Sequence, residues 1–396
     1  MTTLRTRGLT IAVVALAGTI SIANGATAKS LANQWLDGEI PYTGPKITYS
    51  GPTITIRHSH FIGEAAAVDG PNHVKMMKRI EKDTGGKLKI RVYWQNSLAD
   101  ATRGAFDAVS SGVADQSQCY PLFDPSRFNL WMGLQLPNLV DSGTRASRIL
   151  TEMYPKYLRA EYEAQNVYVS KVMSVPSNYL LTKDRQIKVP ADVSGRKLWA
   201  VGDIPTRAAK AVGAVPVPLP PQDLYLSFQS GVIDIAQMHD AGVALFRLIE
   251  LTKFRTVVDM QANTVPVCMN KKVFDDLPPD LKEYYYRTMQ IWNHAEAEPY
   301  FEDFAAEVRA DMEKRGIKSY VPEGEEKAQW TKAFAPIEAA WVAEMEAKGV
   351  KGAADMLAAF RKRNEELKKI SWDDMFKLAA EQPVDGLISS YSLPPR

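Results

Sequence analysis

The feature that most constrains the fold is the alternation of β-rich runs with helical patterns from residue 53 onward. Residues 53–58 alternate apolar and polar side chains with period two, which is typical of a half-buried strand. Apolar residues then recur at helical spacing over 74–80, and Gly85 and Gly86 end that helix. Strands separated by helices of this length indicate parallel βαβ units that are covered on both faces.

The same rhythm continues along the chain. Further strands are predicted at 88–94, 113–120, 167–175 and 197–201, and further helices at 101–110, 146–164 and 206–212. Beyond Pro278 and Pro279 the pattern becomes helical: a long amphipathic stretch over 280–315 with a bend at Pro299, then helices at 325–348 and 353–369. No repeat of about 20 to 50 residues is visible, which disfavours solenoids and propellers.

The composition is that of an ordinary globular protein. Hydrophobic residues make up 45% of 396 positions, enough for buried cores in two or three domains. The formal charge of +2 comes from 48 basic and 46 acidic residues, and it falls to zero once Arg5 and Arg7 are removed. Because the chain has no excess of positive charge, we expect no nucleic-acid partner.

The first 28 residues have the features of a secretory signal. Arg5 and Arg7 precede an uncharged run, 9–23, and Ala26-Thr27-Ala28 gives the small-residue pattern of a cleavage site before Lys29. The run is shorter than the roughly 20 apolar residues that span a bilayer. We therefore expect an exported, periplasmic protein.

Cys119 and Cys268 are the only cysteines. An oxidising compartment would let them form one intramolecular bridge. Sequence does not show whether their Cα atoms lie within bridging distance, and the interpretation favoured here is two buried free thiols.

His58 and His60 are the first candidates for chemistry, since period two places both side chains on one face of a strand end. Metal sites and amidohydrolase-type barrels use this arrangement. Such a barrel needs further ligands at later strand ends, whereas only His73, His239 and His294 remain. The preferred interpretation is a polar cleft edge; an exported metal-dependent hydrolase that uses His58 and His60 is the alternative.

The chain lacks the common catalytic motifs. It has no Gly-x-Ser-x-Gly elbow, no Walker-type phosphate loop and no Gly-x-Gly-x-x-Gly fingerprint. We therefore predict a binding protein with no enzymatic activity, no catalytic residue, no bound metal and no cofactor. A module that binds a partner through its charged C-terminal helices is a further alternative.

The segment 188–237 carries four short motifs in a fixed order: Asp-x-x-Gly-x-Lys at 192–197, Gly-Ala-x-Pro at 213–216, Asp-x-Tyr at 223–225 and Gln-x-Gly-x-x-Asp at 229–234. Flanking matches occur at 84–88, 95–98, 136–139, 270–272 and 277–281. In these features the chain resembles the dicarboxylate-binding-type substrate-binding proteins of tripartite ATP-independent periplasmic (TRAP) transporters. The resemblance runs from Thr53 to Lys348 in the right order.

The resemblance implies an α/β, two-domain periplasmic binding protein fold of type II-like form, with mixed β-sheets flanked by helices, hinge strands and a long domain-spanning helix. We expect a monomer that encloses a small organic solute between its domains and delivers it to TRAP integral membrane subunits. The expected parts are a signal peptide (1–28), an extended lead-in (29–52), domain I (53–174 and 265–304), domain II (175–264 and 305–350) and a C-terminal helical extension (351–396).

Two positions depart from the family pattern. Most relatives carry an arginine that grips the ligand's carboxylate where this chain has Trp199, which offers a stacking face and one N–H but no charge. Relatives that bind a metal with the ligand place an acidic residue where this chain has Gln237, followed by Met238. A neutral amide and a thioether are poor ligands for a hard cation.

The same resemblance places Trp199, Gln237 and Met238 at ligand-binding positions and adds five more: His60, Phe61, Tyr120, Tyr179 and His239. Together with Trp199, the tyrosines form an aromatic lining suited to flat or partly apolar ligands. We predict a ligand that is aromatic or alicyclic and weakly charged or neutral. An aromatic acid stays open, because Arg207, Lys183 or Arg57 could hold a carboxylate from a new direction.

Overall fold

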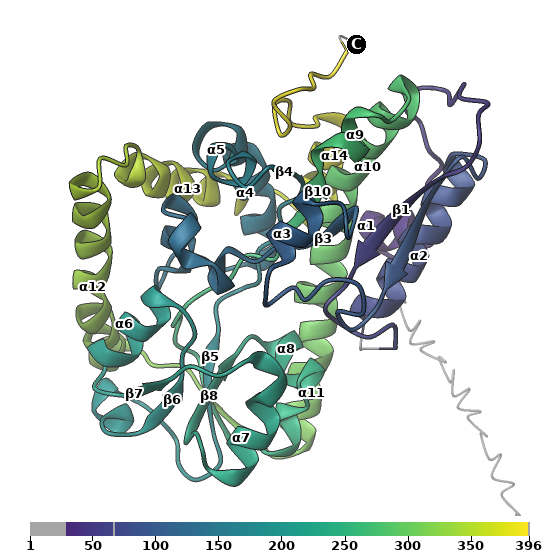
Figure 1. Cartoon of the computed structure of the whole chain (residues 1–396). Helices are drawn as coiled ribbons and strands as arrows, with labels where there is room; N and C mark the ends of the chain where they lie inside the picture. The colour runs from purple at the N-terminus through teal and green to yellow at the C-terminus, as the bar shows by residue number, and fades with distance from the viewer. Residues whose placement is uncertain (1–28, 66–67, 395–396) are drawn as a thin grey trace, which may run out of the picture.

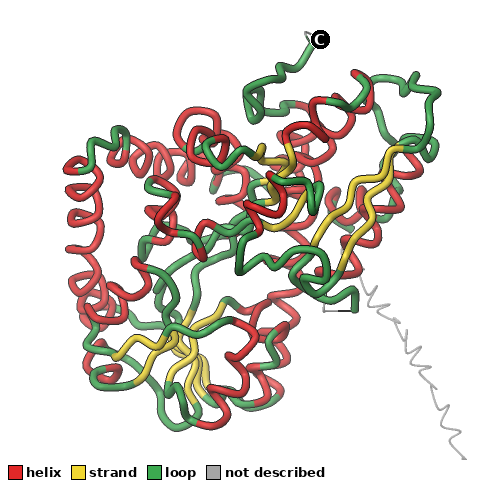
Figure 2. The backbone as a smooth tube through the Cα atoms, viewed as in Figure 1, coloured by secondary structure: helices red, strands yellow, loops and turns green. Residues whose placement is uncertain are grey.

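The computed structural model describes residues 29–65 and 68–394. The expected signal peptide, residues 1–28, lies outside the described residues. The described chain folds into two halves, each built on a β-sheet with helices around it (Figure 1). Figure 2 shows the strands of the two sheets as separate groups, joined by loop segments and by a long helix.

The strands are β1 (Ile54–Ser59), β2 (Leu88–Tyr93), β3 (Gln116–Gln118), β4 (Val167–Lys171), β5 (Tyr179–Thr182), β6 (Lys197–Trp199), β7 (Val215–Val217), β8 (Ile235–Met238), β9 (Phe254–Thr256), β10 (Val267–Asn270) and β11 (Lys318–Tyr320). The α-helices are α1 (Leu31–Leu36), α2 (Asp69–Asp83), α3 (Ala105–Ser110), α4 (Gly143–Tyr157), α5 (Arg159–Glu163), α6 (Asp203–Ala211), α7 (Leu224–Ser230), α8 (Asp240–Leu245), α9 (Lys271–Asp275), α10 (Pro279–Glu298), α11 (Ala305–Lys314), α12 (Gly324–Ala347), α13 (Ala353–Leu367) and α14 (Trp372–Glu381). A π-helical segment, η7 (Pro299–Phe304), joins α10 to α11.

Both sheets are mixed. The first has the order β2-β1-β3-β10-β4 and the second the order β11-β9-β5-β8-β6-β7. β1 is parallel to β2 and β3, and β6 is parallel to β7 and β8, as the βαβ prediction requires. β10 runs antiparallel to β3 and β4, and β5 runs antiparallel to β8 and β9. Each of these two strands is the first one after the chain crosses from the other sheet, which explains the reversed direction.

The two extended crossing segments, 172–178 and 257–266, are hydrogen-bonded to each other. Val175 N donates to Asn263 O at 2.8 Å, and Asn178 N donates to Gln261 O at 2.7 Å. The third crossing is the helical run from α10 through η7 to α11, which passes along both halves (Figure 1). The run departs from α-geometry from Pro299 onward, where a bend was predicted, because proline lacks the N–H that the helix would use.

The C-terminal helices cover the outside of both halves. α12 contacts α6 of the second half and α13, and it forms one edge of the molecule (Figure 1). α13 packs on α4, and α14 packs on α10. The predicted helices at 325–348 and 353–369 therefore exist with nearly the expected bounds. Among the described residues, no helix combines the length and the apolar composition that a membrane crossing requires.

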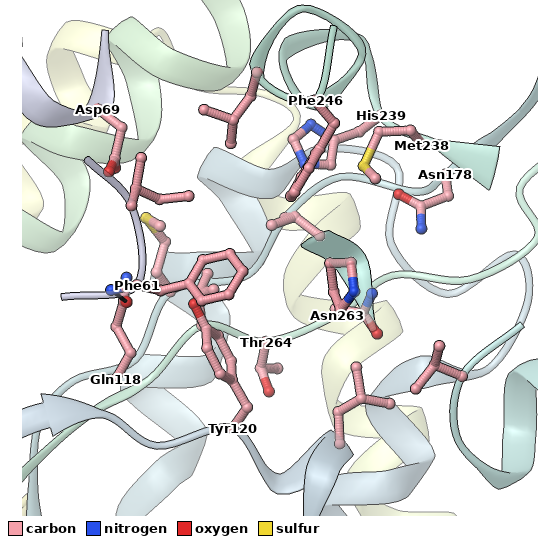
Figure 3. A pocket seen from close by; sticks show the side chains of 18 of the residues that line it. Phe61, Asp69, Gln118, Tyr120, Asn178, Met238, His239, Phe246, Asn263 and Thr264 are labelled. Atoms are coloured by element: carbon pink, nitrogen blue, oxygen red, sulfur yellow. Dashed lines mark hydrogen bonds between the residues drawn. The ribbon is translucent and has the colours of Figure 1, made fainter. Parts of the chain in front are cut away.

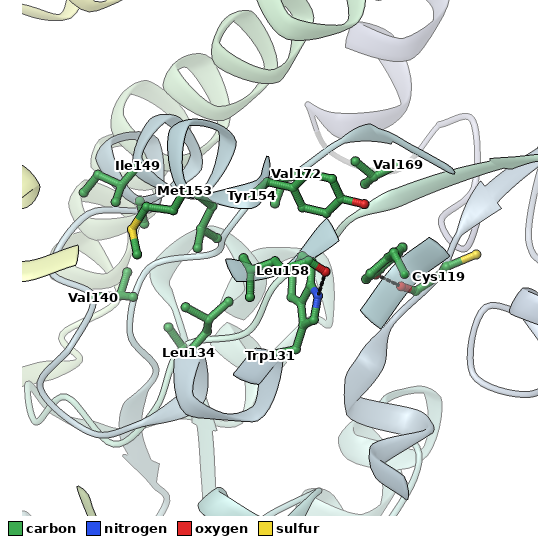
Figure 4. Packing of buried hydrophobic residues seen from close by; sticks show 14 of the residues in the cluster. Cys119, Trp131, Leu134, Val140, Ile149, Met153, Tyr154, Leu158, Val169 and Val172 are labelled. Atoms are coloured by element: carbon green, nitrogen blue, oxygen red, sulfur yellow. Dashed lines mark hydrogen bonds between the residues drawn. The ribbon is translucent and has the colours of Figure 1, made fainter. Parts of the chain in front are cut away.

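The core of the first half is rich in aromatic side chains. Figure 4 shows Trp131 and Tyr154 among aliphatic side chains of α4 and β4, and the Trp131 indole N–H donates to Leu158 O at 3.3 Å. The expectation of two free thiols was wrong: Cys119 and Cys268 form a disulfide, with their Cα atoms 5.7 Å apart. The antiparallel pairing of β3 with β10 brings the two cysteines together, and no local pattern in the sequence encodes that pairing.

Candidate ligand-binding cavity

A cavity of about 140 Å³ lies between the two halves (Figure 3). Its first wall comes from the first half: Phe61, Ile62, Asp69, Gln118, Tyr120, Leu122 and Phe123. Its second wall comes from the second half: Trp199, Val201, Pro221, Met238, His239, Leu245 and Phe246. The crossing segments and η7 close it with Met173, Val175, Asn178, Gln261, Asn263, Thr264, Val265, Tyr300 and Phe301.

The size of the cavity limits what it can hold. A dry protein cavity of about 150 Å³ lined by apolar side chains accepts one benzene molecule. A space of about 140 Å³ therefore suits a single ring with a small substituent. The mostly apolar and aromatic lining favours such a ring, because ligand sites combine apolar walls with a few placed polar groups.

The first wall is formed at the ends of β1 and β3, where their chains leave the sheet. Phe61 N donates to the Gln118 side-chain oxygen at 2.7 Å, which fixes the Phe61 backbone beside β3. The Tyr120 ring meets Phe61 edge to face at 6.3 Å between centroids, and it meets Phe123 at 5.7 Å. Burial raises the pKa of Tyr120 well above its ordinary value, so its hydroxyl stays protonated.

Among the described residues of the lining, Asp69 is the one acidic side chain, and it begins α2. Burial, with the charge of Glu296 as a smaller cause, raises its pKa to about 8, while Lys171 acts in the opposite direction. Its Oδ2 lies 3.5 Å from His60 Nε2 and has no hydrogen-bond partner.

The second wall is formed at the ends of β6 and β8. Trp199 lines the cavity, and its indole N–H donates to Leu219 O at 3.0 Å, so this donor is already used. His239 caps α8 by accepting from Gly242 N at 3.2 Å. Burial lowers the pKa of His239 to about 3, which keeps the imidazole neutral.

Several polar atoms at the crossing segments have no partner in the protein. The side-chain oxygens of Asn178 and Gln261 are buried without a hydrogen bond. Asn263 differs, because its side-chain oxygen accepts from Gln135 at 3.0 Å. Buried polar groups are normally paired, so the Asn178 and Gln261 amides are available to a molecule in the cavity.

Of the residues predicted to bind ligand, five line the cavity: Phe61, Tyr120, Trp199, Met238 and His239. His60 is fully buried behind the first wall, and Gln237 is buried below the second, where its amide donates to Trp199 O at 2.7 Å. Tyr179 does not line the cavity, because its ring lies under the Arg255 guanidinium at 4.3 Å.

Arg207 lies elsewhere, on α6, where it pairs with Glu344 of α12 at 2.6 Å and with Asp203 at 2.7 Å. The other two cations considered for a carboxylate are also occupied: Arg57 pairs with Asp115, and Lys183 donates to Phe228 O. Among the described residues, no lysine or arginine lines the cavity.

The structure does not support the alternative of a metal-dependent hydrolase, because His58 and His60 do not form a metal site that substrate can reach. His58 and His60 are both 0% exposed, and neither lines the cavity. A catalytic metal needs a coordination position that water and substrate can reach.

The sequence prediction missed the polar part of the lining. No recognised sequence motif contains Asp69, Asn178 or Gln261. Asn178 directly precedes Tyr179, which was predicted to bind the ligand. A strand-end register shifted by one residue would have selected Asn178, since neighbouring side chains of a strand point to opposite faces. Gln261 lies in a crossing segment without periodicity, so no local signal could have found it.

Comparison with known proteins gives one matching family model, DctP, described as bacterial extracellular solute-binding protein, family 7, over residues 59–346. A solute-binding protein of Verminephrobacter eiseniae is 22% identical over 290 residues, covering 72% of this chain and 82% of the relative. The 2,3-diketo-L-gulonate-binding periplasmic protein YiaO of Escherichia coli is 25% identical over 213 residues, covering 52% of this chain and 62% of its own.

Two solved structures have the same fold. A TRAP solute-binding protein from Rhodoferax ferrireducens, in complex with copurified benzoate, superposes with a TM-score of 0.73 at 23% identity, covering 80% of this chain and 99% of its own. A TRAP periplasmic solute-binding protein from Bordetella bronchiseptica, with bound mandelate, gives 0.72 at 23% identity, covering 79% and 99%.

Proposed function

Because the chain belongs to family 7 of the bacterial extracellular solute-binding proteins, the binding proteins of TRAP transporters, we propose that it captures a ring-containing organic solute. The solute is aromatic or alicyclic and neutral or weakly charged. It occupies the cavity between the two halves, and the loaded protein passes it to the integral membrane subunits of its transporter.

One observation carries this proposal: a cavity of about 140 Å³ has aromatic walls and no lysine or arginine in its described lining. A buried carboxylate without a cation or several donors is strongly disfavoured. A neutral ring loses little on leaving water and gains dispersion contacts with the walls. Micromolar capture needs about 8 kcal/mol, which one stacked ring and a few hydrogen bonds can supply.

The benzoate and mandelate in the similar structures support a ring of this size. Both of those ligands carry a carboxylate. In this chain the corresponding strand end has Trp199, whose N–H donates to Leu219 O. The ligand proposed for this chain therefore resembles benzoate and mandelate in shape but lacks their negative charge.

Capture follows from closure of the two halves. The proposed domains are 53–174 with 265–304, and 175–264 with 305–350, hinged at the crossing segments. A ligand that touches both walls favours the closed form by the extra contacts it makes there. In the described part of the C-terminal extension, 351–394, α13 packs on α4 and α14 packs on α10, and no residue of this part lines the cavity.

The proposed location is the periplasm, after cleavage of the signal peptide before Lys29. Binding and release need no covalent step, so the proposal includes no catalysis. We propose that the protein acts as a monomer, because one chain supplies both walls of the cavity.

The experiment is a matched ligand panel on purified residues 29–396, read by calorimetry and thermal shift. Benzyl alcohol and benzoate have the same aromatic ring but differ in charge. Cyclohexanol has a ring that is not aromatic, and succinate is an aliphatic dicarboxylate without a ring. We expect benzyl alcohol or cyclohexanol to bind at least tenfold tighter than benzoate, and succinate not to raise the melting temperature. Tightest binding of succinate would exclude the ring, and tightest binding of benzoate would exclude the neutral preference.

A further inference from the structure

Three imidazoles lie together behind the first wall of the cavity. His58 belongs to β1, His60 directly follows that strand, and His73 lies in the second turn of α2. The ring centroids of His60 and His73 are 4.1 Å apart, and those of His58 and His60 are 5.4 Å apart. One ring nitrogen of each residue lies within 4.8 Å of the other two, and all three residues are at most 1% exposed.

The polar atoms of this cluster are incompletely paired. Both ring nitrogens of His58 are buried without a hydrogen bond, and so is Oδ2 of Asp69. A buried polar atom without a partner costs about 1 to 3 kcal/mol, so an imidazole with two such atoms is unusual in a native interior. A bound cation would use a free lone pair of His58. His60 accepts from Ile62 N at its Nδ1, and its Nε2 lies 3.3 Å from the Gln118 amide nitrogen, so a cation bound at Nε2 would replace the Gln118 contact.

His73 has the arrangement that metal-binding histidines commonly show. Its Nδ1 lies 3.0 Å from the backbone oxygen of Asp69, and donation from Nδ1–H leaves the lone pair on Nε2. A second group that could hold an ion, formed by Asp69, His73 and Glu296, shares His73 with the first. Metal ligands are typically oriented in this way by a carbonyl or a carboxylate on the other ring nitrogen.

We propose that His58, His60 and His73, with a carboxylate oxygen of Asp69 as the fourth ligand, bind one zinc ion. Three imidazoles and one carboxylate form an ordinary ligand set for zinc, and a closed tetrahedral site places its nitrogens about 3.3 Å apart. The ligand atoms of the three histidines now lie within 4.8 Å of one another, so zinc binding would draw them closer together. The three imidazoles lie behind the solute cavity, and only Asp69 belongs both to the proposed zinc site and to the cavity lining.

The surroundings fit a cation in charge. Glu296 forms an ion pair with Lys171, so the positive charge of Lys171 is already compensated. The remaining charged group beside the imidazoles is Asp69, which also borders the cavity. Since no ligand position opens to substrate, the ion would tie β1 to α2 and would not hydrolyse anything.

The test uses residues 29–396, refolded from guanidinium chloride with one equivalent of zinc and passed through a desalting column before metal analysis. We expect one zinc per chain and a higher melting temperature than in the zinc-free refolded protein. Refolding with cobalt instead should give the visible absorption bands of a tetrahedral nitrogen and oxygen site, a readout that needs no variant.

His58→Leu and Asp69→Asn should each lower zinc affinity at least tenfold, which is the low end for loss of a ligand or its support. His294→Gln is the matched control: His294 is a buried histidine on α10 that pairs with Glu298 outside the cluster, and its variant should keep the zinc. Absence of stoichiometric zinc and of the cobalt bands in the unaltered chain would overturn the proposal, and so would unchanged zinc affinity in His58→Leu.

Discussion

The two walls of the cavity rest on different kinds of interior. Behind the first wall lie the three imidazoles and the ion pair of Lys171 with Glu296. Behind the second wall lies an apolar cluster that includes Leu181, Leu224, Phe228 and Ile233, with one buried ion pair, Asp240 with Arg255, in the same half. Buried polar groups are therefore more numerous behind the first wall, and apolar packing is more extensive behind the second.

This difference assigns separate tasks to the two walls. The second wall offers flat and apolar surfaces, such as the Trp199 ring, and selects a ligand by shape. The first wall and the crossing segments offer the groups that can hydrogen-bond a substituent, Asp69, Asn178 and Gln261. Changes of charge should therefore be most damaging behind the first wall, and changes of shape most visible at the second.

The largest effect is expected behind the first wall, from Lys171→Met. The change leaves Glu296 buried and without its cation, which typically lowers the free energy of unfolding by about 3 to 5 kcal/mol. Equilibrium denaturation in urea measures the loss. Arg247→Met, which breaks the exposed pair of Arg247 with Glu250, is the control and should leave the unfolding midpoint unchanged. Equal effects of the two changes would contradict the view of a charge-dependent interior.

The next effect concerns the disulfide of the first half. Replacing both Cys119 and Cys268 by alanine should lower the free energy of unfolding by about 2 to 5 kcal/mol, because the bridge closes a long loop of 149 residues in the unfolded chain. The same denaturation experiment, run with and without reductant, measures it. Reductant should destabilise the unaltered protein and have no effect on the double variant. Insensitivity of both proteins to reductant would show that the bridge does not form.

At the second wall, Trp199→Arg should reverse the proposed charge preference. A guanidinium at the end of β6 supplies charged hydrogen bonds worth about 1.5 to 3 kcal/mol to a carboxylate. The ratio of benzoate affinity to benzyl alcohol affinity should rise at least tenfold, as measured by calorimetry. Trp199→Phe keeps an aromatic ring without charge and serves as the control. An unchanged ratio in Trp199→Arg would show that the preference is set elsewhere in the cavity.

A smaller effect is expected in the pH dependence of stability. Burial holds the pKa of His239 at about 3 in the folded protein, against about 6.5 in the unfolded chain. Between these two pH values the His239 imidazole is protonated in the unfolded chain and neutral in the folded protein, so the free energy of unfolding decreases as the pH falls. From pH 6.5 to 4.5 the unaltered protein should lose about 2 kcal/mol more than His239→Gln. Parallel pH profiles would mean that His239 titrates normally.

The smallest effect is expected from Arg207→Gln. Arg207 pairs with Glu344 on the outside of α6, so its loss should cost less than about 1 kcal/mol of stability. Affinity for the preferred ligand should stay within about twofold, since a change of 0.4 kcal/mol or less is expected at such a distance from the site. A tenfold loss of affinity would show that Arg207 contributes to ligand binding and would contradict the assignment of the binding site to this cavity.

Much of the fold followed from local sequence patterns. The helix predicted at 325–348 is α12, Gly324–Ala347, and the strand predicted at 88–94 is β2, Leu88–Tyr93. Periodicity and terminating glycines act within a few residues, so each element could be found without knowing its neighbours. The family motifs added the order of the two halves.

The cavity was predictable only in part. Phe61, Tyr120 and Trp199 were found because they end strands within recognisable motifs. Asp69 begins a helix that has no motif, and Gln261 lies in an irregular crossing segment. Their place in the cavity depends on how the crossing segments pair with each other, and the bridge between Ser174 and Thr264 joins parts of the chain about 90 residues apart.

The sequence by itself determined the α/β architecture, the family, and the presence of Trp199 where most relatives carry an arginine. Each of these features can be recognised from residues that are close together in the sequence. Tertiary structure alone decided that Cys119 meets Cys268, that Arg207 is held by Glu344, and that His73 joins His58 and His60. The physical reason is that these long-range contacts depend on the direction of each strand after a crossing and on how the helices pack. Strand direction and helix packing are set by the burial of whole apolar faces, so the sequence around each contacting residue does not identify its partner.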